Sequence, residues 1–137
     1  MTKALVESVE KYKRLDILPS EVAAAIRAAL GNQSACLTTL EPDSLGLQGA
    51  ILVRSPDVVH ALNLFLEGKV MGEHLTKWAE DLIMSDVFEF SPKSEGGGEI
   101  LKEVMHRLAN PEINNSLSES IVHYYKSCID SGISPSL

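Results

Sequence analysis

Residues 55–83, SPDVVHALNLFLEGKVMGEHLTKWAEDLI, carry two successive helical patterns separated by Gly68. Ser55-Pro56-Asp57 is typical of a helix start, because serine caps, proline suits the first turn and the acid favours the helix dipole. Apolar residues then recur at helical spacing on one face in each half. They are Val58, Val59, Leu62, Leu64, Phe65 and Leu66, followed by Met71, Leu75, Trp78, Ala79, Leu82 and Ile83. This pattern predicts two amphipathic helices, the first ending at Gly68 and the second presenting Glu80 and Asp81 to solvent.

Helical patterns also precede and follow this stretch. Leu5, Val9 and Tyr12 predict a first helix, and a second begins near Pro19 and ends at Gly31. Further helices bury two more sets, namely Ile100, Leu101, Val104, Met105 and Leu108, and then Ile121, Val122, Tyr125, Cys128 and Ile129. Ser116 and Glu119 have the spacing of a capping box before the last helix. Residues 32–54 fit either helical turns or strands.

The chain therefore predicts an all-α fold, a compact single-domain bundle of about five to seven helices over residues 1–137. Its length of 137 residues fits one domain. The segment SPKSEGGGE contains three consecutive glycines and a proline, so a flexible loop is expected at about 91–98. Residues from about 132 to 137 are expected to form a loose tail.

Composition indicates a cytoplasmic globular protein. Apolar residues make up 45% of the chain, yet no apolar run approaches the roughly 20 residues that span a bilayer, so no membrane association is expected. Glu7 and Glu10 interrupt the apolar core that a signal peptide would need. The cysteines Cys36 and Cys128 form no metal or redox motif, and Cys128 is predicted to be a buried thiol.

The charge is concentrated in the second half of the chain. Residues 1–66 hold six basic and seven acidic residues, a net charge of −1, whereas residues 67–137 hold six basic and twelve acidic residues, a net charge of −6. Phosphate contacts need clustered lysine and arginine, so nucleic acid is not an expected partner. A basic protein is a better electrostatic match, although an acidic surface that only confers solubility is an equally simple explanation.

Signals for catalysis or for a bound metal or cofactor are weak. Glu103 and His106 form an ExxH pair, but a carboxylate-bridged di-iron site needs a second such pair, and Glu119 and His123 have the wrong spacing. Neither Cys36 nor Ser34 belongs to a recognisable nucleophile motif. The chain is therefore predicted to have no enzymatic activity, no cofactor and no metal site.

The segment around DVFEF is the candidate binding surface. Asp86 and Glu89 flank Phe88 and Phe90, and Glu80 and Asp81 precede them. Aromatic anchors ringed by charge are common at protein interfaces. The predicted partner-binding residues are Glu80, Asp81, Asp86, Phe88 and Glu89, and a solvated helix end is the alternative. Trp78 is predicted to pack in the core.

Two further stretches are ALNLFLEGKVMGEHLTKWAEDL (61–82) and HRLANPEINNSLSES (106–120). They resemble small bacterial immunity proteins, which accompany polymorphic toxins, including contact-dependent growth inhibition systems and colicin-like toxins. The resemblance implies a cytoplasmic helical protein that binds and blocks the toxic domain of a cognate effector, often a nuclease with a basic surface. A helical adaptor domain with another protein partner is the alternative. The sequence gives no indication of the oligomeric state.

Overall fold

The computed structural model describes the whole chain except residues 1, 32–35, 91–97, 111–116 and 136–137. Within that part it contains six α-helices, two short 3-10 helices and two strands. The helices are α1 (Thr2–Tyr12), α2 (Pro19–Leu30), α3 (Ser55–Leu66), α4 (Gly72–Met84), α5 (Gly98–Ala109) and α7 (Glu119–Ser131). The 3-10 helices η2 and η3 span Leu37–Thr39 and Pro42–Leu45, and the strands are β1 (Ile51–Val53) and β2 (Phe88–Phe90). The predicted mostly helical bundle is confirmed.

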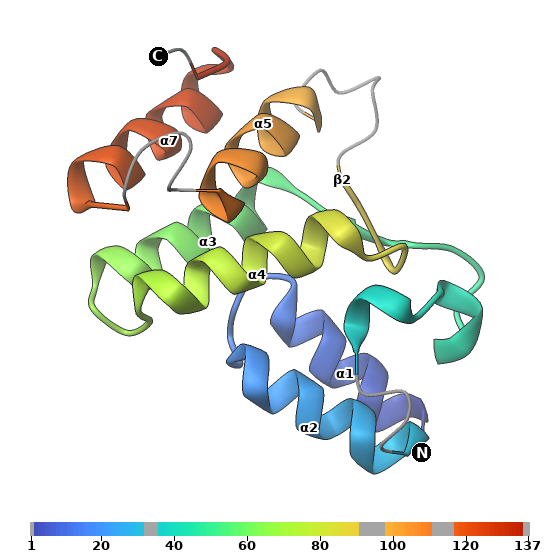
Figure 1. Ribbon diagram of the computed structural model, residues 1–137. Coiled ribbons are helices and arrows are strands. Elements are labelled where there is room, and N and C mark those ends of the chain that lie inside the picture. The colour runs from blue at the N-terminus through green and yellow to red at the C-terminus, as the bar shows by residue number, and fades with distance from the viewer. Residues whose placement is uncertain (1, 32–35, 91–97, 111–116, 136–137) are drawn as a thin grey trace.

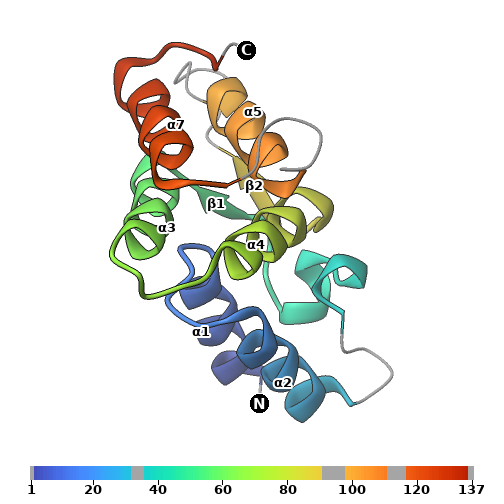
Figure 2. The same cartoon turned by 60° about the vertical axis from the view of Figure 1, so that its left-hand side comes forward.

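Helix α4 lies at the centre of the molecule. In Figures 1 and 2 the pair α1–α2 lies on one side of it, while α3, α5 and α7 lie on the other. Its apolar face is buried along its length, and Trp78 has no exposed surface. The indole Nε1–H donates a hydrogen bond of 2.8 Å to the backbone carbonyl of Tyr12, at the end of α1. The prediction that Trp78 packs in the core is therefore confirmed.

The ends of α3 differ slightly from the sequence prediction. Arg54, rather than Ser55, is the N-cap residue, and its backbone N–H donates to Asp57 Oδ2 at 3.0 Å. Proline consequently occupies the second helical position, where its missing N–H still leaves no carbonyl unpaired. The helix ends before Gly68, as predicted, and Gly68 has a φ of +75°, a left-handed conformation that favours glycine.

A small two-stranded parallel sheet pairs β1 with β2. Strand β1 comes from residues 32–54, which the sequence left unassigned, and β2 comes from the DVFEF segment. Strand β1 pairs with β2 so that Leu52 lies opposite Glu89. Side chains alternate across a strand, so Glu89 is exposed while the rings of Phe88 and Phe90 turn inward. These rings are only 7% and 6% exposed. The prediction that Phe88 lies on an aromatic interaction surface is wrong, because strand pairing directs its ring into the core.

The C-terminal helices pack as their apolar patterns predict. Leu101, Val104, Met105 and Leu108 are buried on α5, and Val122, Tyr125 and Cys128 are buried on α7. The N-cap of α7 is Ser118, whose hydroxyl accepts a hydrogen bond from Ile121 N at 3.3 Å. The predicted capping residue Ser116 lies outside the described residues.

The predicted loop and tail have different outcomes. Most of the expected loop at 91–98 lies outside the described residues, and Gly98 already belongs to α5. In the described part of the tail, Gly132, Ile133 and Ser134 are exposed, whereas Pro135 is buried and its carbonyl accepts a hydrogen bond from Arg107 Nη2 at 3.4 Å. Arg107 therefore holds the segment after α7 against α5. None of the helices in the described ranges has the length and apolar character needed to cross a membrane.

Candidate functional site

Three of the predicted partner-binding residues, Glu80, Asp86 and Glu89, are exposed, and we refer to them together as the acidic surface. Glu80 lies near the end of α4, Asp86 lies between α4 and β2, and Glu89 lies on β2. Lys77 Nζ is 3.9 Å from Glu80 Oε1, a long contact between two side chains that are about half exposed. Such a pair contributes little to stability in water. These carboxylates therefore remain accessible to a partner.

Asp81 does not belong to this surface, and the prediction that it points outward is wrong. The residue is 5% exposed, and its carboxylate accepts two hydrogen bonds. Tyr12 Oη donates to Asp81 Oδ2 at 2.6 Å, and Lys77 Nζ donates to Asp81 Oδ1 at 2.8 Å. Asp81 follows Trp78 by three residues, so both side chains lie on the face of α4 that meets α1. A charged residue at this position is buried because α1 supplies its partner.

The electrostatics of this contact agree with a structural role. Burial, followed by the charge and hydrogen bonding of Asp81, raises the pKa of the Tyr12 phenol well above its ordinary value. The hydrogen bond with Asp81 also raises the pKa of Lys77, against the opposing effect of burial. Both shifts favour the protonated donors that the carboxylate needs. Tyr12, Lys77, Trp78 and Asp81, which we call the α1–α4 cluster, therefore hold these two helices together.

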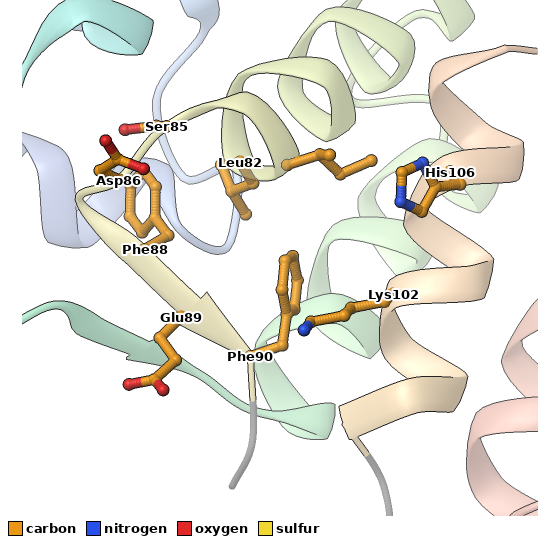
Figure 3. A pocket seen from close by; sticks show the side chains of 9 residues that line it. Leu82, Ser85, Asp86, Phe88, Glu89, Phe90, Lys102 and His106 are labelled. Atoms are coloured by element: carbon orange, nitrogen blue, oxygen red, sulfur yellow. The ribbon is translucent and has the colours of Figure 1, made fainter. Parts of the chain in front are cut away.

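A hollow of about 330 Å³ lies beside the acidic surface, between β2, α5 and the end of α4. Its lining comprises Leu82, Ile83, Ser85, Asp86, Phe88, Glu89, Phe90, Lys102 and His106. Figure 3 shows the ring of Phe90 between Asp86 on one side and Lys102 and His106 on the other. The side chain of Glu89 points away from α5, at the edge of the hollow. Phe88 thus contributes to the apolar floor of the site rather than to an exposed anchor.

Lys102 and His106 were not among the residues predicted for this site. They are exposed and one helical turn apart on α5, a spacing that places both on one helical face. This spacing was visible in the sequence, but nothing there placed α5 beside β2. The sequence prediction therefore described an acidic surface, whereas the hollow carries charges of both signs.

The ExxH pair forms no metal-binding cluster. Glu103 Oε2 accepts a hydrogen bond from Arg107 Nε at 3.1 Å, so the carboxylate is engaged with arginine one turn later. In the described part of the chain, no group of three or more His, Cys, Asp or Glu side chains could hold a metal ion.

The two cysteines occupy different environments. Cys128 is 4% exposed, as predicted for a buried thiol. Cys36 is exposed, and its sulfur lies 2.7 Å from Thr38 Oγ1. Hydrogen bonding by Thr38 lowers the pKa of the Cys36 thiol.

No protein-family model matches this chain, and neither does any curated protein or solved structure.

Proposed function

We propose that the protein is a toxin-neutralising immunity protein that acts in the cytoplasm. It binds the toxic domain of a cognate effector that has a basic surface, nuclease domains being one such class, and blocks it through the acidic surface of Glu80, Asp86 and Glu89. The resemblance of residues 61–82 and 106–120 to small immunity proteins supports this proposal. Another support is the net charge of −7, most of which comes from the second half of the chain.

The observation that carries the proposal is the state of the exposed carboxylates. Within the described part of the chain, Asp86 and Glu89 take part in no ion pair, while the neighbouring Asp81 is fully engaged. An exposed carboxylate without an ion-pair partner stays hydrated in the free protein. It accelerates association with a surface of opposite charge. Glu80 lies on α4 and Glu89 on the paired strand β2, with Asp86 in the short turn between these elements, so regular structure positions the backbone that carries them.

The test begins with the gene immediately upstream: where it encodes a large secreted protein with a variable C-terminal domain, that domain is expressed in cells with and without this protein. We expect the protein to restore growth and to bind the purified domain with an affinity that falls as salt is raised. A variant with Glu80→Lys, Asp86→Lys and Glu89→Lys is expected to lose at least about tenfold in affinity, mostly through slower association.

A matched control changes the same charge elsewhere. Glu7, Glu10 and Asp130 are also exposed, and their replacement by lysine alters the net charge equally. We expect this control to keep nearly all of the affinity. Equal losses of affinity in the two variants would mean that net charge alone matters. If the protein neither restores growth nor binds the toxic domain, the immunity function is rejected. Binding to another protein through the same surface would instead support an adaptor domain.

A further inference from the structure

The hollow between β2 and α5 has walls of opposite charge across an aromatic floor. Asp86 lies on the β2 side, Lys102 and His106 lie on the α5 side, and Phe90 lies between them (Figure 3). Leu82 and Ile83 of α4 add apolar surface. Its volume of about 330 Å³ falls at the lower end of the range of small-ligand pockets.

The two opposing charges have no partner among the residues that the structure describes. In the part of the chain that the structure describes, neither Asp86 nor Lys102 takes part in an ion pair or a side-chain hydrogen bond. The next basic residue on α5 differs, because Arg107 is engaged with Glu103 and with the carbonyl of Pro135. The hollow therefore offers a free carboxylate at one end and a free ammonium group at the other.

From this arrangement we propose that the hollow binds a ligand with an ammonium group and a carboxylate at the two ends of an apolar chain. Asp86 accepts hydrogen bonds from the ligand ammonium, and Lys102 with an N–H of His106 donates to its carboxylate. The methylene chain lies over Phe90 and the side chains of α4. ω-Amino acids have this chemistry, and so does a lysine at the C-terminus of a polypeptide. The proposal does not depend on the immunity function.

Ligands with one charge fit this hollow less well. A carboxylic acid would be attracted by Lys102 but repelled by Asp86. An amine would be attracted by Asp86 but repelled by Lys102. A ligand with both charges is attracted at both ends, and its chain covers apolar surface. Discrimination between two-charge and one-charge ligands is therefore the property that identifies the site.

The first experiment titrates the protein with 6-aminohexanoate and follows backbone amide signals by NMR. We expect saturable shifts at residues 85–90 and 102–106, with a dissociation constant on the order of millimolar for so small a ligand. Hexanoate and hexylamine, which keep one charge each, are expected to bind at least about fivefold more weakly than 6-aminohexanoate. Equal binding of the three compounds, shifts confined to other residues, or no saturation would overturn the proposal.

Variants then test the two ends separately. Asp86→Asn and Lys102→Met should each weaken 6-aminohexanoate binding about threefold to fivefold, as expected for a single exposed charge contact. Both side chains are exposed, so thermal unfolding should stay as in the parent. Asp43→Asn and Lys3→Met change exposed residues in other regions and should leave binding intact. Losses in these controls that match those of the site variants would contradict the assignment.

A final comparison separates the two sources of the ligand. A short peptide ending in lysine is titrated with a free C-terminal carboxylate and, separately, as its amide. Binding of the free acid but not the amide assigns the site to polypeptide C-termini. Binding of 6-aminohexanoate without either peptide assigns it to a free ω-amino acid. Equal binding of the acid and the amide would reject the role of Lys102.

Discussion

The α1–α4 cluster and the hollow between β2 and α5 contain the same kinds of side chain in different states. Each has an aspartate, a lysine and an aromatic ring. Asp81 is buried and accepts hydrogen bonds from Tyr12 and Lys77, whereas Asp86, five residues later, is exposed and faces Lys102 across an open hollow. Residue type therefore does not distinguish a structural contact from a binding site. Burial and internal hydrogen bonds distinguish them, because a ligand cannot reach a buried carboxylate that already accepts hydrogen bonds from its neighbours.

The largest effect is expected from Trp78→Ala, which should destabilise the α1–α4 cluster. Removing a fully buried large aromatic side chain costs about 3 to 5 kcal/mol, and the lost Nε1 hydrogen bond to Tyr12 adds to this. Urea denaturation followed by circular dichroism measures the change. Trp78→Phe keeps much of the volume and should cost clearly less. Parental stability of Trp78→Ala would show that the cluster does not hold the helices.

A direct comparison of the two regions replaces each aspartate by alanine. Asp81→Ala leaves the buried Tyr12 hydroxyl without its acceptor, so we expect a loss of about 2 to 3 kcal/mol in the free energy of unfolding. Asp86→Ala removes an exposed side chain and should change stability by less than about 0.5 kcal/mol. The same denaturation measurement serves both variants. Equal effects would remove the distinction between a structural and a binding carboxylate.

A smaller effect than that of Asp81→Ala is expected from Tyr12→Phe, and it depends on alkaline pH. The folded-state pKa of Tyr12 is raised above its unfolded value of about 10, so its stabilising contribution is present below that pH and is lost as the pH rises further. Tyr12→Phe should cost about 1 kcal/mol at neutral pH. Its stability should then fall less steeply than the parent's above about pH 10. Thermal unfolding measured between neutral and alkaline pH checks this, and parallel curves for the two proteins would contradict it.

Much of the fold was predictable because helical periodicity is local. The spacing of Leu5, Val9 and Tyr12 alone places them on one helical face, whatever the rest of the chain does. Gly31 and Gly68 end their helices because glycine readily adopts a positive φ. The candidate site was predictable only in part. Glu80, Asp86 and Glu89 are exposed as expected, but Asp81 and Phe88 are not. Lys102 was missed because its importance depends on a neighbour that is distant in sequence.

The helices, their buried faces and the excess of acidic charge could be predicted from the sequence alone, since helical patterns are local and charge is a property of composition. Only the three-dimensional fold pairs β1 with β2, buries Asp81 against Tyr12 and places Asp86 and Lys102 around the same hollow. A three-residue parallel strand has no partner nearby in the chain, and its pattern is too short to separate it from a helical turn. Whether a carboxylate is buried in a structural contact or exposed to a ligand depends on whether a helix distant in sequence supplies a hydrogen-bond donor. No local sequence pattern contains that information.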